Sequence, residues 1–151
     1  MAAHIEISTR LSKPVDVVWK AMQSSHCLLF LSAPLLRFVP IEPAVLPRTW
    51  SVGGVYRFQL RLFGLLPVGW HELRPVRKDE SRHELENNDR TPSARSWKHV
   101  LSVHAAGADA CIYTDALDID AGWRTPFLVL FLKYYYRHRH RRWPLYDESH
   151  D

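Results

Sequence analysis

The sequence predicts an α+β fold in which a long C-terminal helix covers one face of an antiparallel sheet. Residues 55–62 alternate strictly, with Tyr56 and Phe58 on one face and Arg57 on the other, which is typical of a half-buried antiparallel strand. Residues 127–146 combine apolar and basic side chains at helical spacing. An open sheet must bury its apolar face, and this terminal helix is the obvious cover.

The first third of the chain predicts one strand followed by two short helices. Residues 4–9 alternate and contain β-branched side chains, which favours a strand. Apolar side chains recur at helical spacing over residues 13–22, and a second short helix is expected over residues 24–31. Four prolines in residues 34–47 predict an extended, irregular segment with a strand near 36–41.

The rest of the chain predicts antiparallel strands joined by turns. Strands are expected over residues 55–62, 68–76, 82–86, 95–104 and 111–117. Gly122 ends the sheet region, and Pro126 begins the terminal helix. No repeat or low-complexity linker interrupts the chain, so we expect a single domain over residues 1–151.

A helical projection of residues 127–146 predicts which side of the terminal helix is buried. The face expected against the sheet holds Phe127, Phe131, Tyr134, Tyr135, His138 and Leu145. The opposite side holds Val129, Lys133, Tyr136, Arg137 and His140. We expect deep burial of the first turns and a solvated basic surface over residues 137–142. The apolar run at 127–132 is far shorter than the ~20 residues of a spanning helix, so no stable membrane insertion is expected.

Charge and cysteine usage limit the other partners. The net charge is +4, and residues 133–142 hold five of the cationic side chains and no acid. A nucleic-acid binder usually spreads its basic surface more widely, so no nucleic acid is expected. Cys27 and Cys111 lack metal-ligand spacing, and no cofactor motif is present, so we expect neither metal nor cofactor. Without a secretory signal pattern, the protein is expected in the cytoplasm. The sequence leaves open whether the protein forms a homodimer.

The order of these elements resembles a known superfamily. "HIEISTRLSKPVDVVWKAM" resembles its opening strand and a helix with a P-x-x-x-V-W signature, and "GGVYRFQLRLFGLLPVGWHEL" resembles its central hairpin. "RSWKHVLSV" and "CIYTDALDID" resemble its last two strands. The chain is therefore similar to START-like, or Bet v 1-like, proteins (SRPBCC), which include polyketide cyclases. The resemblance implies a helix-grip fold, in which a seven-stranded antiparallel sheet curls around the terminal helix and leaves a cavity between them.

A cavity in that fold would be lined by the inward faces of the strands and by the helix. The predicted ligand-binding residues are Tyr56, Phe58, His71, Trp97, His99, Tyr113, Asp115, Phe131, Tyr135 and His138. His99 and Asp115 are also candidates for acid–base catalysis, because a buried carboxylate beside an imidazole orients it and favours its protonated form. Such a pair equally serves to satisfy buried polar groups without any catalytic role.

Three functions are compatible with these patterns. The first is binding of a hydrophobic or aromatic small molecule, lipid-like or polyketide-like, between sheet and helix. The alternative is an enzyme of the cyclase, dehydratase or hydrolase type that uses His99 and Asp115. The third is an interaction module whose basic helix binds anionic lipid or nucleic acid in a salt-dependent way. No nucleophile elbow of the Gly-x-Ser-x-Gly type is present.

Overall fold

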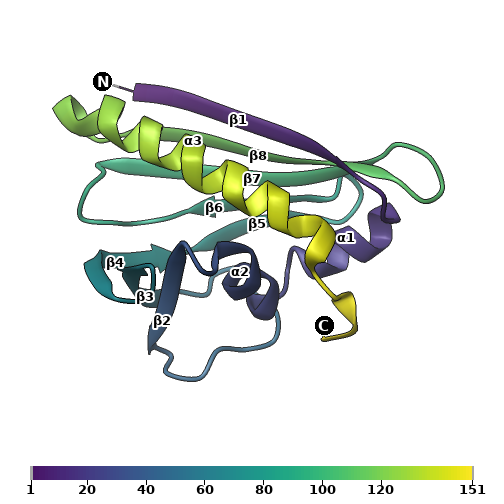
Figure 1. Cartoon of the computed structure of the whole chain (residues 1–151), viewed down its shortest axis with the longest axis horizontal. Helices are drawn as coiled ribbons and strands as arrows, with labels where there is room; N and C mark the ends of the chain where they lie inside the picture. The colour runs from purple at the N-terminus through teal and green to yellow at the C-terminus, as the bar shows by residue number, and fades with distance from the viewer. Residues whose placement is uncertain (1, 151) are drawn as a thin grey trace.

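A computed structural model describes residues 2–150, which form an α+β fold (Figure 1). The helices are α1 (Val15–Ala21), α2 (Ser25–Ser32) and α3 (Thr125–Arg142), with 3-10 turns η1 (Gly122–Arg124), η2 (Trp143–Leu145) and η3 (Glu148–His150). The strands are β1 (Ala2–Leu11), β2 (Leu36–Glu42), β3 (Tyr56–Leu62), β4 (Leu66–Leu73), β5 (Pro75–Asp79), β6 (Glu84–Asn88), β7 (Ser96–Ala105) and β8 (Cys111–Asp120).

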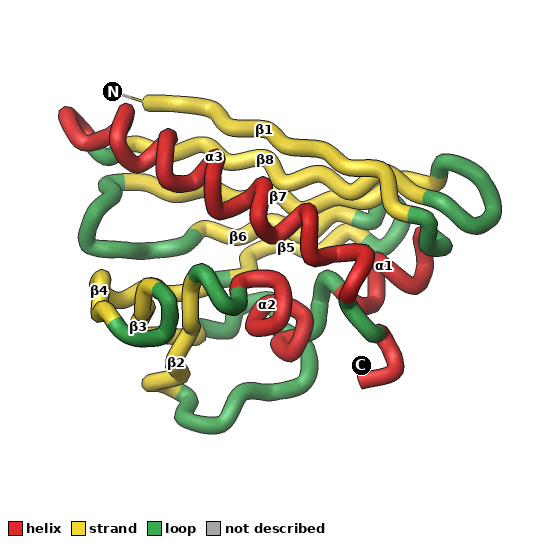
Figure 2. Tube along the Cα trace, viewed as in Figure 1, coloured by secondary structure: helices red, strands yellow, loops and turns green. Residues whose placement is uncertain are grey.

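The strands form two antiparallel sheets (Figure 2). One has five strands in the order β1-β8-β7-β6-β5, and the other has three in the order β2-β3-β4. Figure 1 shows α3 running across the five-stranded sheet, with α2 and the three-stranded sheet along its other side. The helix packs mainly against β1 and α2. This arrangement is the helix-grip fold that the sequence predicts.

The strand count differs from the expected seven because one predicted strand is divided. The strand expected over residues 68–76 separates at Arg74 into β4 and β5, which belong to different sheets. Pro75 has no N–H to donate, and the pairing with β6 shifts register between Pro75 and Arg77. The eight strands are therefore close to the seven of the resemblance, with one long strand bent across both sheets.

The predicted buried face of the terminal helix is wrong for most of its residues. Phe127 and Tyr134 are 70% and 60% exposed, whereas Tyr136 and His140, expected on the outer side, are 4% and 6% exposed. The buried positions of α3 are Thr125, Leu132, Tyr135, Tyr136, Arg139 and His140. Hydropathy ranks Arg and His as surface residues, so a projection weighted by hydropathy cannot detect a face that is anchored by polar contacts.

Two apolar clusters hold the elements together. One joins β1, α1, α2, β6, β7, β8 and η2 around Trp143, Val103 and Leu11. The other joins α3 to both sheets around Phe58, Leu117 and Leu132. The helix α3 ends at Arg142, and Pro144 lies in the following turn η2. A proline at this place cannot continue the helix, because it has no N–H to donate.

Candidate functional site

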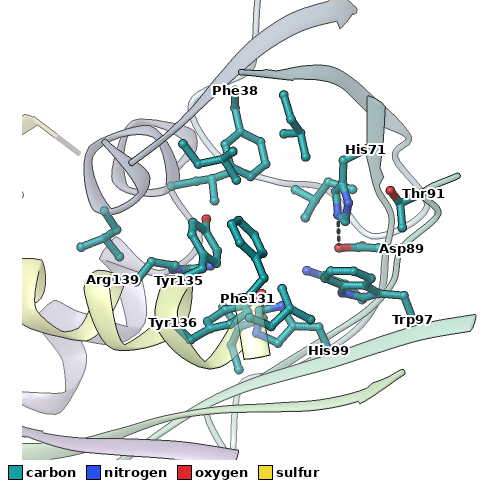
Figure 3. Close-up of a pocket in the computed structure, with 18 of the residues that line it drawn as sticks. Phe38, His71, Asp89, Thr91, Trp97, His99, Phe131, Tyr135, Tyr136 and Arg139 are labelled. Carbon is teal, nitrogen blue, oxygen red and sulfur yellow. Dashed lines mark hydrogen bonds and ion pairs between the residues drawn. The ribbon is translucent and has the colours of Figure 1, made fainter. Parts of the chain in front are cut away.

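A cavity of about 350 Å³ lies between α2, α3 and the two sheets (Figure 3). Its walls are mostly apolar or aromatic, with Phe38 from β2, Leu101 from β7 and Leu132 from α3 as examples. Figure 3 shows Phe131 reaching into the middle of this space. A cavity of this size and lining is typical of sites that take small organic molecules.

Asp115 is the buried centre of a polar cluster next to this cavity. It is 0% exposed. Its Oδ1 accepts hydrogen bonds from His99 Nε2 at 2.7 Å and from the Tyr113 hydroxyl at 3.0 Å, and its Oδ2 accepts one from His140 Nε2 at 2.8 Å. The carboxylate thus has three donors, which is how a buried charge is stabilised.

The strand pattern explains how this cluster forms. Tyr113 and Asp115 are two residues apart on β8, so both point to the same face of the sheet. Leu101 of β7 pairs with Asp115, which places His99, two residues earlier on β7, in the diagonal position on that face. His140 reaches the carboxylate from α3. The cluster therefore joins β7, β8 and the terminal helix.

The electrostatics of the cluster keep Asp115 ionised. Burial alone raises the pKa of its carboxyl, but the Arg139 charge and the hydrogen bonds from His140 and His99 hold that pKa well below its usual range. Burial and the Asp115 charge raise the pKa of the Tyr113 hydroxyl well above its ordinary value. Because Asp115 only accepts hydrogen bonds, His99 donates through Nε2, and its Nδ1 is the ring nitrogen available to a bound molecule.

Arg139 brings a buried positive charge to the cavity wall. The residue is only 5% exposed, and its guanidinium lies 5.1 Å from the Tyr136 ring and 5.8 Å from the Tyr135 ring. Its Nε has no hydrogen-bond partner. Burial lowers the pKa of the guanidinium, yet the Asp115 charge holds it well above its ordinary value, so the group is a cation.

A second imidazole–carboxylate pair lies on the opposite side of the cavity from Arg139 (Figure 3). His71 Nε2 of β4 is hydrogen-bonded to Asp89 Oδ2 at 2.8 Å, and both residues are buried. Asp89 Oδ1 accepts a hydrogen bond from the Arg74 backbone N–H at 3.0 Å, which fixes the carboxylate. The Trp97 ring meets the His71 ring edge to face at 5.1 Å. The cavity therefore has a polar group at each end.

Six predicted ligand-binding residues line the cavity, and four do not. The lining residues are His71, Trp97, His99, Tyr113, Phe131 and Tyr135. The four outside the lining are Tyr56, Phe58, Asp115 and His138. The part that the six play in ligand binding stays a prediction. The catalytic candidates His99 and Asp115 lie within hydrogen-bond distance, but only His99 faces the cavity.

The residues outside the lining have structural partners instead. Phe58 is fully buried and packs edge to face on Phe38 at 5.3 Å. The Tyr56 hydroxyl accepts a hydrogen bond from the Ser51 backbone N–H at 3.0 Å. His138 Nε2 donates to the Ala33 carbonyl at 2.8 Å, which ties α3 to the end of α2. The side chains of Phe58, Tyr56 and His138 are therefore engaged in packing and hydrogen bonds outside the cavity lining.

Three polar residues of the site were not predicted. Arg139 and His140 were assigned to the solvated basic surface, and Asp89 lies between the strands predicted over residues 82–86 and 95–104, where no functional residue was expected. A usable signal exists for the helix, because Tyr136, Arg139, His140 and Trp143 are spaced three or four residues apart, as on one helical face. No pattern in the sequence marks Asp89, because its role depends on β4 lying beside residues 89–91.

Three further observations concern a thiol, metal binding and membrane spans. Burial raises the pKa of the Cys111 thiol, which makes it a poor nucleophile. Among residues 2–150, no three His, Cys, Asp or Glu side chains are grouped so as to hold a metal ion. The same part of the chain contains no helix that is both long and apolar enough to cross a membrane. The polar groups that line the cavity include imidazoles, a carboxylate, hydroxyls and one guanidinium.

A long C-terminal helix, gripped by antiparallel strands over an apolar cavity, defines the class: the chain has the Bet v 1/START-like superfamily fold. It belongs to the family described as Domain of unknown function (DUF8410), whose sequence pattern matches residues 9–145. No curated protein matches the chain in sequence.

Solved structures with the same fold are distant in sequence. Protein CV1439 from Chromobacterium violaceum has a TM-score of 0.67 and 14% identity, covering 93% of this chain and 97% of that one. Zhui aromatase/cyclase from Streptomyces sp. R1128 has a TM-score of 0.60 and 12% identity, with 81% and 70% covered. Norcoclaurine synthase from Thalictrum flavum, in complex with dopamine and hydroxybenzaldehyde, has a TM-score of 0.63 and 10% identity, with 87% and 77% covered. These similarities establish the fold.

Proposed function

We propose that the protein binds a hydrophobic or aromatic small molecule, lipid-like or polyketide-like, in the cavity between α3 and the sheets. The observation that carries the proposal is the cavity itself, about 350 Å³ of space with mostly apolar and aromatic walls. Burying apolar surface contributes about 25 cal/mol per Å², so an apolar ligand gains affinity over its whole contact area.

The lining favours flat, aromatic ligands over flexible chains. Tyr135, Tyr136 and Trp97 present rings to the cavity, and Phe131 projects between them. Ring pairs in offset or edge-to-face contact add about 0.5–1.5 kcal/mol to plain burial. The norcoclaurine synthase structure, which holds two small aromatic molecules, and the aromatase/cyclase both support this ligand class.

Thermal unfolding with 2-naphthamide, a flat neutral probe, tests the proposal. At a concentration of 100 times Kd the probe adds about 2.7 kcal/mol of stability. For a chain of this size, about 2–4 °C of Tm per kcal/mol gives a rise of roughly 5–10 °C. Leu101→Trp fills the cavity and should abolish the rise, whereas Val100→Trp, on the other face of β7, should retain it. The absence of a Tm rise across a panel of flat apolar probes would count against ligand binding.

A second candidate function is acid–base catalysis on the bound molecule. It is favoured because two imidazoles, His99 and His71, line the cavity, and each is hydrogen-bonded to a buried carboxylate. A carboxylate that fixes the orientation of an imidazole is the arrangement used by general bases, which contribute about 10²–10⁴-fold to rates. Ester hydrolysis is one reaction that such a pair promotes by activating water.

Hydrolysis of 2-naphthyl acetate, followed by the fluorescence of released 2-naphthol, tests this second function. The wild type should exceed the buffer rate, and His99→Gln or His71→Gln should lower the rate by about a hundredfold or more if that imidazole is the base. His104→Gln is the matched control, because His104 lies on the same strand as His99 but is exposed. A wild-type rate equal to that of buffer removes the hydrolase version of the proposal.

A further inference from the structure

Arg139 is a buried cation without a carboxylate of its own. It is 5% exposed and lines the cavity, and its Nε has no hydrogen-bond partner. Among residues 2–150, no carboxylate oxygen lies within the 4.0 Å of an ion pair to its guanidinium. Charged side chains are almost never this buried unless they are paired, because desolvating an isolated charge is costly.

Neither Asp115 nor the Tyr135 hydroxyl serves as the ion-pair partner of the guanidinium. Asp115 stabilises the guanidinium by its charge, but both carboxylate oxygens are already taken by His99, Tyr113 and His140. The Tyr135 hydroxyl also interacts with the guanidinium, but it is uncharged and is hydrogen-bonded to Ser32 Oγ at 2.6 Å. Arg139 therefore keeps one buried donor, Nε, without a hydrogen-bond partner, and its charge lacks a carboxylate in contact among residues 2–150.

The donor geometry of this group selects its partner. A guanidinium presents its N–H groups as a planar fork that matches the two oxygens of a carboxylate. The Tyr136 and Tyr135 rings lie 5.1 and 5.8 Å from it and meet each other edge to face, so they offer an aromatic surface beside the guanidinium. An aromatic carboxylate satisfies both features at once.

The far end of the cavity constrains the rest of the ligand. Trp97 Nε1 is a buried donor and Asn87 Oδ1 a buried acceptor, and neither has a hydrogen-bond partner. Both residues line the cavity, and Trp97 lies with the His71–Asp89 pair on the side away from Arg139 (Figure 3). A ligand hydroxyl or carbonyl can accept a hydrogen bond from Trp97 Nε1, and a hydroxyl can also donate to Asn87 Oδ1.

From these contacts we infer that the ligand is an aromatic or similarly apolar carboxylic acid whose carboxylate pairs with Arg139 and whose hydroxyl or carbonyl group lies toward Trp97. The inference deepens the proposed ligand-binding function and rests on it. It assigns Arg139 as the residue that selects acids over neutral molecules of the same shape.

Calorimetric titration with 2-naphthoate and 2-naphthamide tests the selection, because the two probes differ only in the charged group. The wild type should bind the acid about ten- to a hundredfold more tightly than the amide, as expected for hydrogen bonds to a charged group. Arg139→Met should abolish that preference. Arg142→Met is the matched control and should retain it, since Arg142 lies on the same helix and stacks on Phe30, 4.3 Å away, outside the cavity lining.

The outcomes separate the two proposals. If the amide binds and the wild type shows no preference for the acid, the carboxylate inference is overturned while ligand binding stands. An unchanged preference in Arg139→Met overturns it equally. If neither probe binds, both proposals fail. Should Arg139→Met not fold, a crystal structure of the wild type with 6-bromo-2-naphthoate decides. The carboxylate is expected on the guanidinium, and a carboxylate turned toward His71 or solvent overturns the inference.

Discussion

Replacing the central carboxylate by an amide, Asp115→Asn, probes the polar cluster that joins α3 to the sheet. The carboxylate accepts three hydrogen bonds, from His99, Tyr113 and His140, and its charge offsets that of Arg139. An amide keeps one acceptor oxygen but presents an NH₂ group to a donor, and it removes the negative charge that stabilises the buried guanidinium from a distance. Hydrogen bonds to a charged group contribute about 1.5–3 kcal/mol each, and at least two of the three are weakened or lost, so we expect a loss of about 3–5 kcal/mol at pH 7.

Urea denaturation at pH 7, followed by tryptophan fluorescence, measures this loss. With m of about 2 kcal/mol per molar urea, the midpoint should fall by roughly 1.5–2.5 M. Asp118→Asn is the matched control, because Asp118 lies on the same strand and is hydrogen-bonded to His4, but both side chains are more than half exposed. It should leave the midpoint nearly unchanged. An Asp115→Asn midpoint within about 0.3 M of the wild type would refute the assignment.

The pH dependence of stability provides a second, independent test with the same variant. The pKa of Asp115 is depressed in the folded state, relative to about 3.9 in an unfolded chain. Its contribution to stability is therefore fully present above about pH 4 and is lost as the pH falls through the folded pKa. The stability gap between wild type and Asp115→Asn should persist from pH 7 to pH 5 and narrow below pH 4. A gap that widens on acidification contradicts an ionised Asp115.

Two other substitutions test the assignment of faces and contacts. Leu132→Ala should cost about 2–5 kcal/mol, because Leu132 is 3% exposed, whereas Leu130→Ala should be nearly neutral at 72% exposure. Equal urea midpoints for the two variants would contradict the orientation of α3. Tyr113→Phe removes one hydrogen bond to the Asp115 carboxylate and should cost about 1.5–3 kcal/mol. The same urea titration checks it, and a midpoint equal to that of the wild type would argue against this bond.

The strands and helices could largely be predicted from the sequence because their signals are local. Alternation in residues 55–62 and 95–104 depends only on which face of each strand is buried. The division at Arg74 could not be predicted in this way, because β4 and β5 belong to different sheets and only pairing with distant strands separates them. A strand that changes sheets has the same alternation as one that does not.

Strand alternation placed His99 and Tyr113 at the cavity, whereas Arg139 and His140 of α3 and Asp89 of a loop were missed. Period-two alternation placed His99, Tyr113 and Asp115 on one face, and the structure joins them in one cluster. The prediction for the helix was wrong because its buried face contains Arg139 and His140, which hydropathy treats as surface residues. Their burial becomes favourable only beside the Asp115 charge, which is a tertiary effect without a local signature.

The most direct test of the hollow beneath α3 is diffraction from a crystal pressurised with xenon, which occupies empty apolar cavities. We expect xenon density between Leu101 of β7 and Leu132 of α3, in contact with the residues that line the cavity. If no xenon binds there and side chains close the space between α3 and the sheet, the proposed ligand cavity does not exist.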